Sequence, residues 1–198
     1  MTKRLLLRFL FLALMPIASR AQPVENYFMF GPAFAGNQTL GGGSVTVTGG
    51  SGFGNVFGFA FQVARKSAVS LWVEPLSPVF AFSGGTASIQ TSATANSILW
   101  TPAARLTVPV APRIAVFGAL GGGIGYFHNL SLVPYNPPQL KTVTTFHGVF
   151  SGGGGIDIRV WRRVSIRVDA RDYVTGRGLG GVPGRHHFLP MLGIALHY

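Results

Sequence analysis

The chain has 198 residues, of which 11% are charged and 28 are glycine, with 16 Lys and Arg against 5 Asp and Glu. An ordinary soluble domain carries about 25% charged residues, so this chain has little material for a water-facing surface. The 47% hydrophobic and 12% aromatic content argues against intrinsic disorder. Because the chain has no cysteine, a disulfide scaffold, a thiolate metal site, a cysteine nucleophile and a lipidated cysteine anchor are excluded.

The first 21 residues have the features of a signal peptide. Lys3 and Arg4 lie in a basic start, residues 9–18 are apolar, and residues 19–21 place small side chains where a signal peptidase reads them. The apolar run is shorter than the about 20 residues that a transmembrane helix needs. We therefore expect cleavage of residues 1–21, export, and a single mature domain over residues 22–198.

The recurring pattern of the mature chain is alternation with a period of two residues, which is typical of β-strands. Glycine, proline and β-branched residues interrupt the sequence too often for helices. The pattern is plainest between Phe53 and Ala64, where large apolar residues fall on one face and small or polar residues on the other.

This alternation predicts eight strands. Their large apolar residues, in chain order, are Phe28, Phe30 and Phe34; Phe57, Phe59, Phe61 and Val63; Val69, Leu71 and Val73; Trp100, Leu106 and Val108; Ile114, Val116, Leu120 and Ile124; Ile156, Ile158 and Val160; Val164, Ile166 and Val168; and Phe188, Leu192, Ile194 and Leu196. Short links near residues 65–67, 111–113 and 161–163 alternate with long polar links over residues 37–52, 83–97, 129–145 and 176–186.

The second face of the predicted strands decides which side meets the solvent. In a soluble sandwich this face would be rich in polar residues. Here it is small, with Gly58, Ala60, Gly121 and Gly155 among its members. Small residues suit a narrow interior, and an apolar outer face suits lipid once the sheet closes and satisfies every backbone group.

With this pattern the chain resembles the small eight-stranded outer-membrane β-barrel proteins of bacteria, related in plan to the OmpA transmembrane domain and OmpX. Two features carry the resemblance most closely. One is the glycine-rich approach to residues 156–159 with the hairpin that follows, and the other is the C-terminal strand with Leu192, Ile194, Leu196 and the final Tyr198. The resemblance implies an all-β, eight-stranded antiparallel up-and-down transmembrane β-barrel preceded by a signal peptide and located in the bacterial outer membrane.

The resemblance also implies partners. The C-terminal residues Leu192, Ile194, Leu196 and Tyr198 look like the signal that the barrel-assembly machinery reads. Periplasmic chaperones would escort the chain, and outer-membrane lipid and lipopolysaccharide would surround it. We expect a monomer whose external loops give it a structural or surface-interaction role.

Other motifs favour simpler interpretations. The glycine runs at 121–125 and 152–155 lack the Lys-Ser/Thr sequel and the following helix of a phosphate-binding loop. Basic residues lie at turns without interleaved aromatic residues, so we expect no nucleic-acid partner. His128 and the pair His186-His187 have no nearby carboxylate or third ligand, so we expect no metal and no cofactor.

Some eight-stranded outer-membrane barrels modify lipid A, which requires a serine activated by a histidine and a carboxylate. His128 and Ser131 are the nearest candidates, but their spacing differs from the His-x-Ser of the deacylases. We therefore expect no enzymatic activity. A small-solute pore and a lipid A-modifying barrel enzyme remain the alternatives.

Charged residues also fall on the predicted inner face. They are Glu74, Arg105, Asp157, Arg159, Arg167, Asp169 and Arg171. An eight-stranded barrel is just wide enough for side chains to fill, and buried charges persist only when paired. The pattern therefore predicts a lumen plugged by salt bridges.

Charge also predicts the register of the sixth and seventh strands. Placing Asp157 opposite Arg167 leaves Trp161-Arg162-Arg163 as a three-residue loop. The next register in one direction would place Asp157 opposite Asp169, and in the other direction the loop would shrink to one residue. We therefore expect Asp157 opposite Arg167, with glycines opposite Asp169 and Arg171.

Overall fold

The computed structural model describes residues 22–35, 38–40, 45–48, 51–87, 92–133, 139–175 and 185–198. The strands are β1 (Val24–Ala35), β2 (Gln38–Leu40), β3 (Val45–Thr48), β4 (Ser51–Lys66), β5 (Val69–Leu76), β6 (Pro78–Ala87), β7 (Ser92–Trp100), β8 (Ala103–Ala111), β9 (Ile114–Val133), β10 (Gln139–Arg159), β11 (Val164–Thr175) and β12 (Arg185–His197). The described part of the chain has no helix long and apolar enough to cross a membrane. The predicted signal peptide, residues 1–21, lies outside the described residues.

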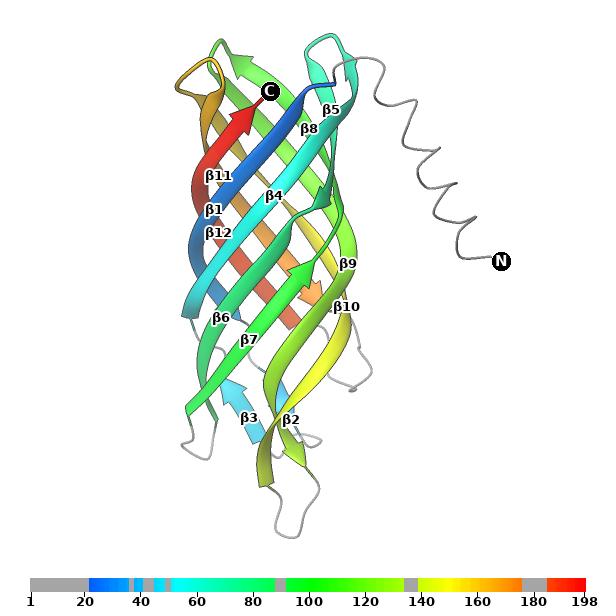
Figure 1. The fold of residues 1–198 in the computed structure, drawn as a ribbon. Helices are drawn as coiled ribbons and strands as arrows, with labels where there is room; N and C mark the ends of the chain where they lie inside the picture. Colours follow the sequence, from blue (N-terminus) through cyan, green and yellow to red (C-terminus); the bar gives the residue numbers. More distant parts are fainter. Residues whose placement is uncertain are drawn as a thin grey trace, which may run out of the picture.

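The strands close into an antiparallel barrel with eight strands around its wall (Figure 1). The third wall strand consists of β5 and β6, which both pair with β4, and the fourth consists of β7 and β8, which both pair with β9. Pairing of β1 with β12 closes the ring. The predicted eight-stranded barrel is therefore confirmed, with β2 and β3 as a short additional hairpin.

The third wall strand changes its inward parity where it is interrupted. Trp72 and Glu74 of β5 are buried at even positions, whereas Val79 and Ala81 of β6 are buried at odd positions. The interruption at Ser77 inserts one extra residue next to Pro78, which has no N–H to donate to a ladder. A simple alternation cannot anticipate this switch.

The two ends of the barrel differ. Short connections at residues 67–68, 112–113 and 161–163 lie at one end, together with the C-terminus (Figure 1). At the other end the strands continue further than predicted. The β6–β7 ladder extends from Pro78 to Thr86 of β6, and the β9–β10 ladder extends as far as Val133 of β9. The long polar links at 83–97 and 129–145 are thus largely strand, which corrects the prediction. Hairpin pairing satisfies their backbone groups despite a composition typical of loops.

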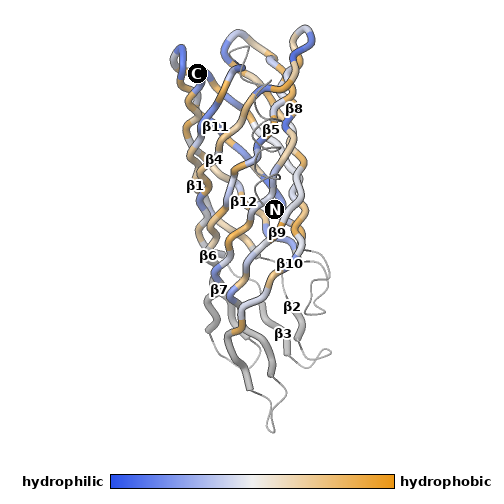
Figure 2. Tube along the Cα trace, turned by 45° about the vertical axis from the view of Figure 1, so that its right-hand side comes forward, coloured by the Kyte–Doolittle hydropathy of each residue, from blue (hydrophilic) through white to orange (hydrophobic). Residues whose placement is uncertain are grey.

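The outer surface of the barrel is apolar, as the alternation predicts. Phe57 is 55% exposed and Leu120 is 63% exposed, and orange and paler segments alternate along the strands in Figure 2. Inward glycines make room for aromatic rings. Gly58 lies opposite Tyr27, and a Cβ atom on Gly58 would lie 2.0 Å from Cζ of that ring.

The interior has two layers. Charged side chains fill the end with the short turns. Toward the other end the interior is mostly apolar, with Ser97, Thr175 and His187 as buried polar side chains. Its fully buried or nearly fully buried apolar side chains include Met29, Val56, Val79, Leu99, Phe127, Val149, Leu189 and Met191.

Candidate functional site

Seven charged side chains form a continuous chain of ion pairs across the lumen, in which acids and bases alternate. Their order is Asp169, Arg171, Glu74, Arg105, Glu25, Arg167 and Asp157. The N···O distances of the six links lie between 2.6 and 3.2 Å. The side chains come from β1, β5, β8, β10 and β11, so the chain of ion pairs connects widely separated parts of the wall.

The link between Arg167 and Asp157 has two hydrogen bonds. Nε and Nη2 of Arg167 donate to the two oxygens of Asp157, each over 2.7 Å. Asp157 lies directly opposite Arg167 in the β10–β11 ladder, so the predicted register is confirmed. Arg167 Nη1 also lies 2.6 Å from Glu25 Oε1, and one guanidinium thereby joins two carboxylates.

Aromatic rings pack against the guanidinium groups of two arginines in the lumen. The Arg105 guanidinium lies over Trp72 and Phe117, at 5.2 and 5.3 Å from the ring centroids. Arg167 lies 5.0 Å from the centroids of Tyr27 and Phe117. The Tyr27 hydroxyl donates to Glu74 over 3.2 Å. Ring faces therefore contact both guanidinium groups, which favours a fixed geometry in the narrow interior.

The structure places six of the seven residues predicted for the lumen in this chain of ion pairs: Glu74, Arg105, Asp157, Arg167, Asp169 and Arg171. The seventh, Arg159, is wrong as a buried member. It faces inward as predicted and lines the cavity at the mouth of the barrel, but it is exposed there and no ion pair joins it to the other six side chains.

Glu25 is the member that the sequence prediction missed. The first predicted strand began with Phe28, so Glu25 lay outside it. In the structure β1 begins at Val24, and Glu25 shares its inward face with the buried Tyr27 and Met29. Extending the odd-numbered inward face by two steps, through Tyr27, would have identified it.

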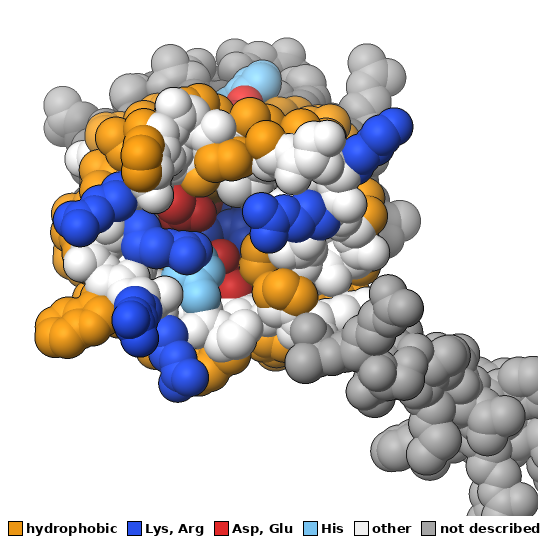
Figure 3. All heavy atoms as spheres, turned by 90° about the horizontal axis from the view of Figure 1, so that it is seen from above, with side chains coloured by type: hydrophobic (Ala, Val, Ile, Leu, Met, Phe, Trp, Pro, Cys, Tyr) orange, Lys and Arg blue, Asp and Glu red, His pale blue; other side chains and the backbone are white. Residues whose placement is uncertain are grey.

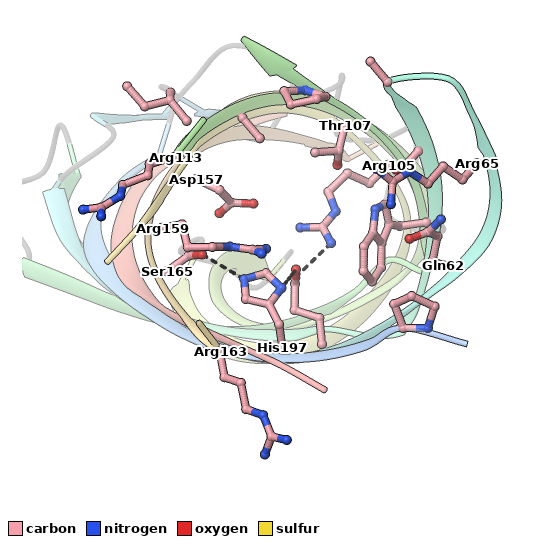
Figure 4. Close-up of a pocket in the computed structure, with 18 of the residues that line it drawn as sticks. Gln62, Arg65, Arg105, Thr107, Arg113, Asp157, Arg159, Arg163, Ser165 and His197 are labelled. Atoms are coloured by element: carbon pink, nitrogen blue, oxygen red, sulfur yellow. Dashed lines mark hydrogen bonds and ion pairs between the residues drawn. The ribbon is translucent and has the colours of Figure 1, made fainter. Parts of the chain in front are cut away.

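Beneath the short turns the lumen opens into a cavity of about 580 Å³ (Figure 3). Its lining includes Glu25, Ser165 and His197. Ser165 Oγ lies 2.8 Å from His197 Nε2, and Nδ1 of the same ring lies 3.4 Å from Glu25 Oε2 (Figure 4). Serine, histidine and carboxylate thus lie in the order that acyl-transfer enzymes use. Ser165 is only 1% exposed, however, and Glu25 already contacts Arg105 and Arg167.

The other candidate histidines lie toward the opposite end. His128 Nδ1 forms a hydrogen bond with Thr144 Oγ1 at 3.1 Å, and the side chain of Ser131 lies outside the described residues. His186 pairs with Asp172 on the exposed surface, and His187 is buried. No group of three or more possible metal ligands occurs in the described part of the chain.

The predicted assembly signal lies on the lipid-facing surface. Leu192, Ile194, Leu196 and Tyr198 are all exposed on one face of the last strand and the residue after it. The backbone N–H of Tyr198 donates to the carbonyl of Val24 over 2.9 Å, so the last residue also takes part in closing the barrel. Recognition of these residues by the assembly machinery stays a prediction.

No protein-family model matches the chain, and no curated protein matches it in sequence. Several solved structures are similar to it in fold. Neisserial surface protein A is 11% identical and aligns over 87% of this chain and 97% of its own, with a TM-score of 0.57. OprG of Pseudomonas aeruginosa is 14% identical over 88% of this chain and 95% of its own, with a TM-score of 0.48. Ail of Yersinia pestis, in complex with the heparin analogue sucrose octasulfate, is 13% identical over 88% of this chain and 99% of its own, with a TM-score of 0.45.

The likeness to Neisserial surface protein A concerns the fold, and the outer surface adds an independent physical argument. A closed sheet leaves no unpaired strand edge, and an apolar face around the whole ring is stable only in lipid. The chain therefore has the fold of the small bacterial outer-membrane β-barrels and the outer surface of a protein that spans that membrane.

Proposed function

We propose that the protein is an integral outer-membrane barrel with a closed lumen, without enzymatic activity, that contributes surface structure or interactions through the hairpins at its long end. The chain of seven ion-paired side chains across the lumen carries this proposal. A conducting pore would need a continuous water-filled path, whereas the interior of a barrel of this size is filled by side chains.

Two layers oppose a path for ions. Separating a link at either end of the ion-pair chain would leave Asp157 or Asp169 buried without its partner, which is strongly unfavourable. Separating an inner link would leave each of its two side chains with one partner in place of two. Beyond that layer apolar side chains predominate, among them Val79, Leu99 and Leu189, and they offer a passing ion few polar groups. Both layers would have to rearrange before a solute could cross.

The long hairpins support a role at the cell surface. β9 has 20 residues and β10 has 21, whereas a membrane-spanning strand needs about 9–11 residues. About half of this hairpin therefore projects beyond the hydrocarbon, at the end opposite the short turns, which face the periplasm in barrels of this plan. There it would meet lipopolysaccharide and external partners.

The same proposal includes the route to the membrane. Residues 1–21 would direct export and be removed, periplasmic chaperones would carry the chain, and the barrel-assembly machinery would insert it as a monomer. The exposed apolar face of β12 supports recognition by that machinery, because it is accessible along its length.

Planar-bilayer conductance of the refolded barrel tests the closed lumen, together with the mass of lipid A from cells that express it. We expect no steady conductance and no change in lipid A mass. The double variant Glu25→Ala/Arg105→Ala removes the centre of the ion-pair chain but leaves the apolar layer in place, so it should also show no steady conductance. A steady conductance of the unaltered protein would overturn the closed lumen, and a shift in lipid A mass would overturn the non-enzymatic role.

The array of Ser165, His197 and Glu25 favours one second candidate, a hydrolase that acts at the periplasmic mouth. A lipid A deacylase is not the matching form, because lipid A lies in the outer leaflet, at the other end of the barrel. Labelling with a fluorophosphonate probe tests this candidate. Labelling that is lost in Ser165→Ala would establish a reactive serine, and an unlabelled barrel would leave the non-enzymatic function.

A further inference from the structure

The cavity at the periplasmic mouth is built from the inner faces of the whole barrel wall. Its lining includes residues of β1, β4, β5, β8, β9, β10, β11 and β12, and its volume is about 580 Å³. Seen from this end, acidic groups and a histidine lie at the bottom of a hollow that basic side chains surround (Figure 3). The volume falls within the range of small-molecule sites, about 300–1,000 Å³.

The charges that line this cavity do not balance. Its arginines are Arg65, Arg105, Arg113, Arg159, Arg162 and Arg163, whereas its acids are only Glu25 and Asp157. Both acids already bind Arg167, which lies in the ion-pair chain below. Arg105 is paired with Glu25 and Glu74, and Arg113 and Arg163 point away from the cavity, so the uncompensated positive charge that can attract an anion into it comes chiefly from Arg159.

One wall of the cavity carries buried groups that lack hydrogen-bond partners. Trp72 Nε1, Arg105 Nη1 and Thr107 Oγ1 are buried and have no partner among the described residues. Trp72 lies opposite Arg105 in the β5–β8 ladder, and Thr107 shares the inward face of β8 with Arg105. A buried donor without a partner is unfavourable, so this wall would gain from an acceptor. The three atoms are shielded from the cavity, so side chains of the wall must shift before a ligand can reach them.

Arg159 supplies the opposite wall. Its side chain reaches across the cavity toward His197, whereas Arg113 and Arg163 point away from the cavity (Figure 4). No ion pair or hydrogen bond joins the Arg159 guanidinium to any of the described side chains. Its donors are therefore available to a ligand between Arg159 and the Trp72–Arg105–Thr107 wall.

We propose that this cavity binds a phosphate-bearing anion, which Arg159 and Arg105 would contact from opposite sides with Trp72 and Thr107 as further donors. Guanidinium groups match the oxygen geometry of phosphate, and several oxygens on one tetrahedral centre can serve donors that come from different walls. The ligand would be a soluble phosphate ester of the periplasm or the headgroup of a lipid in the inner leaflet. The site does not depend on the closed-lumen function, although the ion-pair chain forms its floor.

The test is calorimetric titration of the refolded barrel in phosphatidylcholine nanodiscs with glycerol 3-phosphate and with inorganic phosphate. We expect saturable binding that weakens as the salt concentration rises. Arg159→Gln should weaken binding about tenfold or more, the effect of losing a hydrogen bond to a charged group. Thr107→Val, which keeps the side-chain shape, should weaken it by a smaller factor.

Lys66→Gln is the matched control, because it removes a positive charge from the same end of the barrel without altering the cavity lining. Its affinity should remain close to that of the unaltered protein. Nanodiscs that also contain phosphatidylglycerol separate the two ligand sources. Weaker binding of glycerol 3-phosphate in these discs would indicate a lipid headgroup as the occupant, and equal binding would indicate a soluble ester. The proposal is overturned by an absence of saturable binding, or by equal losses in Arg159→Gln and Lys66→Gln.

Discussion

Asp157 and Arg167 face each other across the β10–β11 ladder and are joined by two hydrogen bonds of 2.7 Å each. The same register places Gly155 opposite Asp169 and Gly153 opposite Arg171. Each of these two charged side chains thus has a neighbour without a side chain, which leaves it free to extend into the lumen. One register therefore determines both the pairing of the wall and the arrangement of the interior charges.

Asp157→Ala should lower the stability of the barrel, because it removes one of the two carboxylates that bind Arg167. Breaking a buried pair costs about 3–5 kcal/mol, and because Arg167 keeps Glu25 we expect about 2–3 kcal/mol. The double variant with Arg167→Ala should cost at least about 1 kcal/mol less than the sum of the single variants. Urea titration of the barrel in liposomes measures each free energy of unfolding.

Asp172→Ala is the control for this cycle, since Asp172 pairs with an exposed histidine outside the lumen. Its cost should stay below about 1 kcal/mol, as for other exposed pairs. Strictly additive effects of Asp157→Ala and Arg167→Ala would mean that the two side chains do not interact.

Phe59→Arg should destabilise the barrel because Phe59 lies on the lipid-facing side of β4. The centroid of its ring lies 6.2 Å from that of Phe61. An arginine near the middle of the hydrocarbon costs about 2–4 kcal/mol in such a barrel, and near the interface about 0–1 kcal/mol. Val110→Arg, next to the short turn after β8, serves as the interfacial control. Equal costs at the two positions, measured by urea titration in liposomes, would mean that Phe59 does not face hydrocarbon.

The strands of the barrel wall could be predicted because each of their two faces requires a different class of residue, which produces an alternating sequence pattern. Lipid requires large apolar residues outside, and the narrow lumen requires small or charged residues inside, so alternation identified strands such as β4 and β11. The extent of the strands at the long end could not be predicted in this way. Beyond the membrane neither face must be apolar, and the pairing of β9 with β10 then leaves no hydrophobic pattern.

The candidate site was only partly predictable for a related reason. Asp157, Arg167 and Asp169 lie on neighbouring strands of one hairpin, so parity and charge sufficed. Glu25 and His197 come together only because β1 pairs with β12, which places them directly opposite each other. Which inward residues meet through barrel closure depends on strand stagger, and a single sequence does not display that quantity.

Gly58→Ala should destabilise the barrel by about 1–3 kcal/mol, as overpacking of a filled interior does. The new Cβ atom would lie 2.0 Å from Cζ of Tyr27, and displacing that ring would break its hydrogen bond to Glu74. Gly148→Ala is the matched control on β10, because nothing lies within 4 Å of its Cβ position. If urea titration gave both variants the same stability, Tyr27 would not occupy the space above Gly58.

The last prediction concerns the C-terminal residue. Deleting Tyr198 would also remove its backbone hydrogen bond to Val24, so the substitution Tyr198→Ala separates recognition from barrel closure.

The Tyr198 side chain is 66% exposed on the lipid-facing surface, so its loss should hardly change refolding in detergent. If the assembly machinery reads this side chain, Tyr198→Ala should nevertheless lower the amount of barrel in the outer membrane, measured by quantitative blotting of membrane fractions. Trp161→Ala removes another exposed aromatic ring at the same end of the barrel and should leave that amount unchanged. Equal losses in the two variants would point to a general interfacial effect, and unchanged abundance in Tyr198→Ala would refute the assembly signal.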